Sequence, residues 1–183
     1  MSKTAVFSVS LLAAFLVALV GFVIQRHFAI PMTRVGKAVF VSAQIAAGDL
    51  GQLSRRRIHT IIDLRPDGED PAQTPSAVMQ QAAAIAGIKF HYIPIPHGEI
   101  NPESVTRLAA ALQDAEMKPA LLYCRSGNRA VRTYALVLAS ETGGPSDKEI
   151  AAMAVSAGHP VADLVEAIRA RIAARTTSVG ISQ

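Results

Sequence analysis

The sequence is poor in cysteine and in aromatic residues. It has one cysteine, no tryptophan, and six phenylalanines and three tyrosines among 183 residues. A single cysteine excludes an internal disulfide framework and a metal site made of cysteines alone. The net charge is only +4, and the basic clusters, at Arg55–Arg57 and near the C-terminus, are not interleaved with aromatic side chains. We therefore expect no nucleic-acid partner. Because no histidines stand at metal-ligand spacing, we also expect no metal and no other cofactor.

The N-terminal residues contain one long apolar run, Ala5–Ile24, which has no charged residue. Twenty helical residues at about 1.5 Å each span the hydrocarbon core of a bilayer. The residues that follow, Gln25–Phe28, offer no small-x-small cleavage site, which favours an uncleaved anchor over a signal peptide. We expect residues 1–25 to anchor the protein in a bacterial inner membrane as a single-pass helix. The flanking basic residues favour a cytoplasmic domain only slightly.

Strand-like and helix-like segments alternate after a linker over 26–37, which contains Pro31 and Gly36. Expected strands are 38–42, 59–64, 89–95 and 120–123, and expected helices are 49–57, 75–86, 101–116, 128–140, 146–157 and 161–174. This alternation predicts an α/β domain over 38–175, with a parallel-stranded central sheet flanked by helices. We expect a disordered tail at 176–183. In such sheets ligands bind beyond the carboxyl ends of the strands.

The segment that carries chemistry is the loop after the last expected strand. It begins with Cys124 and ends with Arg129, directly before a helix. A free thiol has a pKa of about 8.5, and a helix N-terminus with a cation nearby favours the thiolate. Gly127 allows successive N–H groups to point inward as an anion-binding nest, over which the guanidinium of Arg129 can fold. We predict that Cys124 is the nucleophile and that Arg129 assists it; the remaining anion-binding residues are Arg125, Ser126, Gly127 and Asn128.

The loop sequence LLYCRSGNRA resembles the active-site loop of rhodanese-type sulfurtransferases and a shortened protein tyrosine phosphatase signature. Together with VFVSAQ, TIIDLRPDGED, GIKFHYIPIPHGEINPESV and EIAAMAVSAGHPVADL, in their chain order, it is similar to the phosphatase-like domain of bacterial beta-lactamase-hydrolase-like proteins. The resemblance covers roughly residues 38 to 165. It implies a protein-tyrosine-phosphatase-like α/β fold of the dual-specificity type, preceded here by the transmembrane helix.

Three departures from the phosphatase pattern favour sulfur transfer over phosphate hydrolysis. Four residues separate Cys124 from Arg129, where phosphatases of this fold have five. Tyr123 and Ala130 stand where those phosphatases usually have His before the Cys and Ser or Thr after the Arg. The stretch 95–99 has no aspartate to act as the general acid.

Only His97 and Glu99 are available in that stretch as a general acid. We therefore predict a membrane-anchored sulfurtransferase that moves sulfur from an anionic donor such as thiosulfate to a small thiol acceptor through a Cys124 persulfide. The first alternative is a cysteine-dependent phosphatase acting on phosphate esters. The second is a non-catalytic anion- or partner-binding module.

Charged residues also follow the expected strand 59–64, at the same sheet edge as the cysteine loop. Arg65 can approach the anion site from there, or it can form a surface ion pair with Asp67 or Glu69. Asp67, Glu69 and Asp70 lack the ligand spacing of a calcium loop. We expect them to form a solvated turn.

Overall fold

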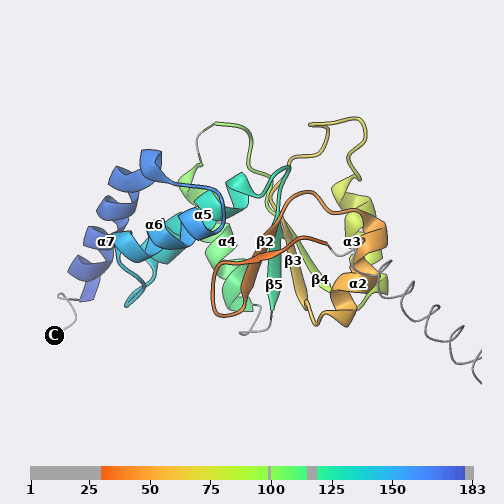
Figure 1. Cartoon of the computed structure of the whole chain (residues 1–183), viewed down its shortest axis with the longest axis horizontal. Coiled ribbons are helices and arrows are strands. Elements are labelled where there is room, and N and C mark those ends of the chain that lie inside the picture. Colours follow the sequence, from red (N-terminus) through yellow and green to blue (C-terminus); the bar gives the residue numbers. More distant parts are fainter. Residues whose placement is uncertain (1–29, 99, 115–118, 180–183) are drawn as a thin grey trace, which may run out of the picture. The chain divides into compact units, whose positions relative to one another are not determined.

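The computed structural model describes residues 30–98, 100–114 and 119–179 (Figure 1). Residues Met32–Gln183 form one compact unit. The expected anchor, Ala5–Ile24, lies outside the described residues. Among those that are described, no helix is long and apolar enough to span a bilayer.

One five-stranded sheet forms the centre of the unit, with the strand order β1-β2-β5-β3-β4. The strands are β1 Thr33–Arg34, β2 Val39–Ser42, β3 Thr60–Asp63, β4 Lys89–Tyr92 and β5 Ala120–Tyr123. Four are parallel, and β1 pairs antiparallel with β2. The sheet is therefore mixed, and our expectation of a purely parallel sheet was wrong. Its edge strand falls in the expected linker, where a tight turn joins it to β2: the N–H groups of Val35 and Gly36 both donate to the carbonyl of Val39.

Helices cover both faces of the sheet. They are η1 Ala47–Asp49, α2 Leu50–Arg55, α3 Ser76–Ile85, α4 Pro102–Asp114, α5 Asn128–Ser140, α6 Asp147–Ser156, η2 Ala162–Leu164 and α7 Val165–Val179. The last helix continues four residues beyond Arg175, into the segment that we expected to be a disordered tail, so that boundary was wrong. Arg175 anchors this helix, because its guanidinium donates to four backbone carbonyls between Leu138 and Pro145.

Alternation along the strands divides the buried side chains between two layers. Ile62 and Leu122 point to the main core, with Cys124 and the buried faces of α4 to α6. Asp63 and Tyr123, one residue further along, point to the opposite face, which α2 and α3 cover (Figure 1). The loop cysteine and the polar ends of β3 and β5 therefore lie on different sides of one sheet.

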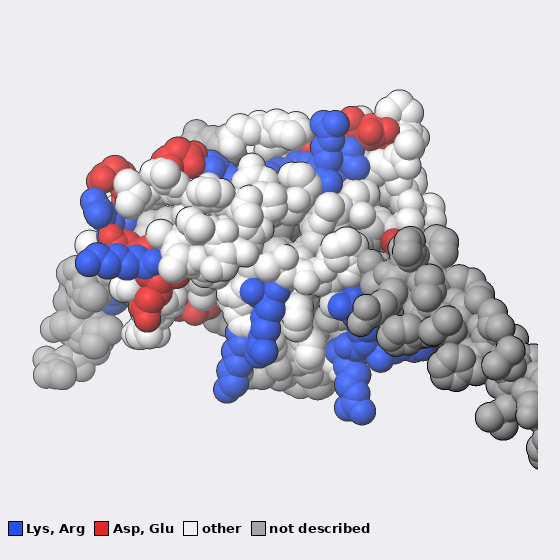
Figure 2. Space-filling model, in the orientation of Figure 1, with Lys and Arg blue, Asp and Glu red and all other residues white. Residues whose placement is uncertain are grey.

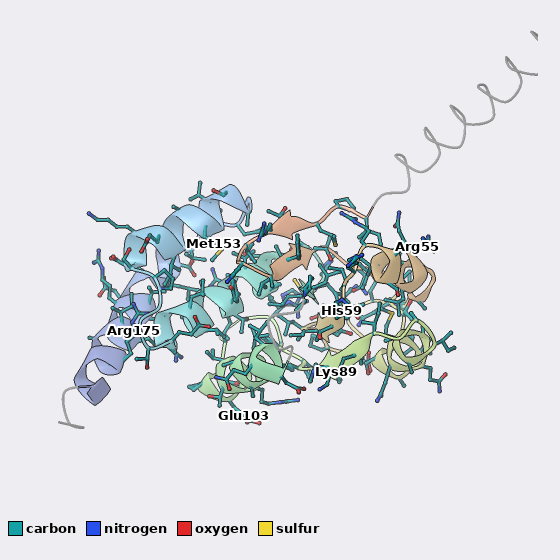
Figure 3. The ribbon with its side chains drawn as sticks, turned by 90° about the horizontal axis from the view of Figure 1, so that it is seen from below. Arg55, His59, Lys89, Glu103, Met153 and Arg175 are labelled. Carbon is teal, nitrogen blue, oxygen red and sulfur yellow. The ribbon has the colours of Figure 1, made fainter. Side chains whose placement is uncertain are left out.

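Helix α5 is the most central helix, with nine of its thirteen residues buried. It packs against α4, α6 and α7. Burying a helix on several sides fixes its axis, and here the N-terminus of that axis lies at the carboxyl end of β5. Figure 3 views the opposite edge of the sheet, where His59 and Lys89 mark the amino ends of β3 and β4. The carboxyl edge is where the candidate site lies.

Candidate active site

Cys124 directly follows β5 and is 1% exposed. The backbone N–H of Gly127 donates to its sulfur at 3.2 Å. Gly127 has φ +91°, a left-handed conformation that favours glycine, and it is the N-cap of α5. The positive end of the α5 dipole therefore lies beside the sulfur, together with the N–H of Gly127. Of the N–H groups predicted to form a nest, that of Gly127 faces the sulfur.

Arg129, in the first turn of α5, is buried beside Cys124, and 8% of its surface is exposed. Its Nη1 donates to the carbonyl of Ile95 at 2.6 Å. Both terminal nitrogens also donate to Glu69, at 2.6 and 2.7 Å. Burial acts to lower the pKa of Arg129, but hydrogen bonding to Glu69 and the attraction of Cys124 more than compensate, and the pKa is raised. The arginine therefore stays charged next to the sulfur.

Glu69 joins two arginines at the site. Besides pairing with Arg129, it accepts a hydrogen bond from Nε of Arg65 at 3.0 Å, and its side chain is only 13% exposed. The hydrogen bonds from Arg129 hold the pKa of Glu69 below its usual range; burial opposes this, and Arg65 adds to it. Our expectation of a solvated turn was wrong for Glu69, because the fold brings Arg129 to it from sixty residues further along the chain.

Arg65 is buried, and it is connected to the site through its hydrogen bond to Glu69. Its Nη1 donates to the side-chain carbonyl of Gln44 at 2.9 Å, and its backbone N–H donates to Oδ1 of Asp63 at 2.9 Å. The ion pair with Glu69 that we left open does form, but it is buried instead of lying on the surface. Arg65 thus reaches the edge of the anion site as a support for Glu69.

The other predicted site residues lie further out. Arg125, Ser126 and Asn128 have exposed side chains, so they line the outer side of the loop. His97 has a side chain that is 70% exposed, with Nε2 3.7 Å from Oε1 of Glu69. Glu99 lies outside the described residues.

Sequence reasoning missed Glu69, Gln44 and the carbonyl of Ile95 as neighbours of the reactive loop. It also missed His159, whose Nε2 would lie 3.0 Å from a Cβ built on Gly127. The available signal was the parallel sheet itself, since residues after β2, β3 and β4 all end at the edge where Cys124 lies. Side-chain partners across that edge have no sequence signature.

Opposite charges are interleaved on this surface. Figure 2 shows basic and acidic side chains next to one another near the top of the view, over the loop after β3. Within the described ranges, no group of three or more His, Cys, Asp or Glu could hold a metal ion. Asp67 instead accepts hydrogen bonds from the backbone N–H and hydroxyl of Ser76, at 2.8 and 2.6 Å, and so holds the start of α3.

A family model for the phosphatase-like domain of beta-lactamase hydrolase-like protein matches residues 32–141, more than half of the chain. A beta-lactamase hydrolase-like protein of Xylella fastidiosa is 31% identical over 102 residues, which are 56% of this chain and 23% of the relative. The match therefore spans about a quarter of that curated relative's length.

Several solved structures with the same fold are phosphatases or phosphatase candidates by name. A phosphatase candidate of Neisseria meningitidis is 29% identical, with a TM-score of 0.64 over 74% of this chain and 94% of that one. A kinase-associated phosphatase, solved with its catalytic-site cysteine replaced by serine, is 16% identical, with a TM-score of 0.63 over 80% of this chain and 96% of that one. At that identity the second likeness shows the fold alone.

Proposed function

The chain belongs to the family of the phosphatase-like domain of beta-lactamase hydrolase-like proteins, and from this we propose that it hydrolyses phosphate monoesters through a phosphocysteine on Cys124. One observation carries the proposal: the sulfur of Cys124 lies at the N-terminus of α5, 3.2 Å from the N–H of Gly127 and beside the buried guanidinium of Arg129. An oxyanion bound there meets backbone donors and a fixed positive charge together. The class of enzyme is a phosphatase-like one with a cysteine nucleophile.

In the first step the Cys124 thiolate attacks phosphorus, and the bond from phosphorus to the ester oxygen breaks. The leaving alkoxide takes a proton from a general acid. The family resemblance puts this acid on the loop after β4, and we assign the role to His97, which Glu69 faces at 3.7 Å. In the second step water attacks phosphorus and passes its proton to His97, the phosphorus–sulfur bond breaks, and phosphate leaves with the thiolate regenerated.

Glu69 has two effects in this scheme. It holds both terminal nitrogens of Arg129, which fixes the plane of the guanidinium beside the sulfur. It also competes with an incoming phosphoryl oxygen for those nitrogens. A substrate therefore binds to an arginine that is already oriented but is still paired with Glu69. This favours phosphoryl groups, which have a high charge density, over anions of lower charge density.

Sulfur transfer, which the sequence led us to prefer, finds no support among the relatives, and neither does a thiol acceptor. The comparisons favour the phosphatase alternative. Three sequence features remain in favour of a persulfide: the four-residue interval between Cys124 and Arg129, the residues Tyr123 and Ala130, and the absence of an aspartate from 95–99. A direct experiment separates the two. The full chain in detergent is assayed with an aryl phosphate, and separately with thiosulfate and cyanide, alongside Cys124→Ser.

Phosphate release that is lost in Cys124→Ser supports the proposal. Thiocyanate production by a wild type that releases no phosphate overturns it.

Anchoring by residues 5–24 is part of the proposal as well, and it rests on the apolar run alone. The anchor would confine the enzyme to phosphate esters at or near a bacterial inner membrane. Membrane fractionation of the full chain against a chain that begins at residue 30 tests it. Recovery of the full chain in the soluble fraction, without detergent, would rule the anchor out.

A further inference from the structure

The face of the sheet opposite Cys124 carries a row of polar side chains at the very ends of the strands. The register places Ser42 beside Tyr123, Tyr123 beside Asp63, and Asp63 beside Tyr92. Side chains in register on neighbouring strands point the same way and lie about 5 Å apart. Asp63 and Tyr123 are 1% and 0% exposed. A carboxyl group and a phenol are thus adjacent and out of water.

Both of these groups are incompletely paired. Oδ1 of Asp63 accepts the backbone N–H of Arg65 at 2.9 Å. Oδ2 of Asp63 and the hydroxyl of Tyr123 are both buried, and neither makes a hydrogen bond of good geometry to any group among the described residues. The hydroxyl is nevertheless close enough to the carboxyl to lower its pKa. Leaving two such atoms unpaired is costly unless they share a proton between them. Their adjacency makes each the natural partner of the other.

The two residues stand directly behind the site. Tyr123 is bonded to Cys124, and its carbonyl accepts the N–H of Leu64 at 2.9 Å. Asp63 holds the N–H of Arg65, whose side chain holds Glu69. Contacts along β5 therefore connect Asp63 to the nucleophile, and contacts along the loop after β3 connect it to the arginine network.

We propose that Asp63 and Tyr123 form a buried proton-sharing pair that positions the Cys124 loop and the Arg65–Glu69 support from behind the sheet. Both are positioning residues, since neither touches the reacting atoms. Tyr123 stands where the phosphatase pattern usually has a histidine before the cysteine. Burial and the neighbouring Asp63 raise the pKa of its phenol, so Tyr123 stays protonated and the titrating member of the pair is Asp63. The effect of the pair on catalysis rests on the proposed function, whereas the existence of the pair does not.

The charged surroundings of Asp63 determine how the pair titrates. Burial is the largest effect on Asp63, and the net result is a pKa raised to about 6. Hydrogen bonds from the Tyr123 hydroxyl and the Arg65 N–H act to lower this pKa. The charge of Asp67 raises it further, and the charge of Arg65 lowers it. Tyr92, from β4, is its other neighbour in register, and α3 has no ionisable residue. Above this pKa, charged Asp63 accepts from both Arg65 and Tyr123; below it, neutral Asp63 becomes a donor and the phenol loses its acceptor.

The test uses the single thiol of the full chain as its own probe. The rate of Cys124 alkylation by iodoacetamide, read by intact mass, is measured against pH with and without inorganic phosphate. We expect an inflection in the wild type near the pKa of Asp63, about 6, with a change in rate of about threefold to tenfold, the size of effect expected from residues that act on a site without touching it. Asp63→Asn keeps the shape and an acceptor for Arg65, and it should lose the inflection.

Tyr123→Phe gives a second result with a defined sign. Because the hydroxyl lowers the pKa of Asp63, its removal should move the inflection to higher pH. Asp114→Asn, an exposed carboxylate that pairs with Lys89, is the control and should follow the wild type. If Asp63→Asn fails to fold, the direction of the Tyr123→Phe shift decides.

The outcomes separate this inference from the proposed function. An inflection that Asp63→Asn removes, in a protein that releases no phosphate from an ester, supports the pair and refutes the phosphatase. Ester hydrolysis with an alkylation profile unchanged in both variants refutes the pair and leaves the phosphatase standing. A downward shift in Tyr123→Phe also overturns the pair.

Discussion

Arg129 and Glu69 face each other through two short hydrogen bonds, of 2.6 and 2.7 Å, across sixty residues of sequence. The carboxylate holds the guanidinium in one plane beside Cys124, and the carbonyl of Ile95 holds the same guanidinium at 2.6 Å. A planar fork fixed on two sides can bind an oxyanion only in a defined orientation. The reactive loop is thus oriented by a residue outside it.

Replacing Arg129 with lysine keeps the charge but loses the fork. We expect Arg129→Lys to lower kcat for an aryl phosphate by about 100-fold or more, the usual cost of losing an oxyanion donor. Arg125→Lys, an exposed residue of the same loop, is the matched control and should retain activity within about threefold. Full activity in both variants would mean that the loop needs only positive charge, and equal losses would mean that the fork of Arg129 has no special role.

Replacing Glu69 with glutamine removes the counter-charge between two buried arginines. We expect Glu69→Gln to lower the free energy of unfolding by about 2 kcal/mol, since it leaves Arg65 and Arg129 poorly compensated. An anion bound at Arg129 would restore part of that loss. Inorganic phosphate should therefore raise the Tm of Glu69→Gln more than that of the wild type, as measured by calorimetry. An equal rise in both would show that Glu69 does not compete with the anion.

Asp63 gives the protein a stability that depends on pH. Its pKa in the folded state is raised from 3.8 to about 6, so the folded protein binds the proton more tightly than the unfolded chain does. Asp63 therefore contributes to the free energy of unfolding below about pH 4, and this contribution is lost as the pH rises through about 6. A pKa difference of about two units corresponds to about 3 kcal/mol. Denaturant unfolding of wild type and Asp63→Asn across that interval measures it.

The difference in unfolding free energy between the two proteins should change with pH in favour of the variant as pH rises. A difference that stays constant from about pH 4 to above 6 would show that Asp63 titrates alike in both states.

Gly127 combines a left-handed backbone with a close neighbour. Gly127→Ala places a Cβ 3.0 Å from the imidazole of His159 at φ +91°. We expect it to cost about 1–2 kcal/mol in backbone strain alone, and to slow Cys124 alkylation by displacing the N–H that faces the sulfur. Gly143→Ala, at φ +70° with nothing within 4 Å of the added Cβ, is the control. It should show a similar loss of stability with unchanged alkylation.

The regular elements and the reactive loop could be predicted because their signals are local. The bounds of β5 and α5 agree with the sequence-based prediction, since an apolar strand, a glycine and an amphipathic helix follow one another without a gap. Edge strand β1 was missed because two residues carry no periodicity. The preference for sulfur transfer came from loop length and the neighbours of Cys124, which do not report what surrounds Arg129.

Glu69 and Asp63 were harder to assign for another reason. Glu69 lies four residues after Arg65 in a Gly-containing turn, a position typical of exposed loops. Only its ion pair with Arg129, which forms in the folded protein, makes it part of the site. Asp63 at a strand end is typical of turns, and only the register with Tyr123 shows a buried pair. Both roles depend on contacts between segments that are distant in sequence.

The measurement that tests the account most directly is the trapping of the covalent intermediate on Cys124. The full chain is mixed with an aryl phosphate, quenched in acid within the first turnover, and its intact mass recorded. The account predicts a gain of one phosphoryl group on the wild type and none on Cys124→Ser. No gain with the phosphate ester, together with a gain of one sulfur atom from thiosulfate, would contradict it and make the protein a sulfurtransferase.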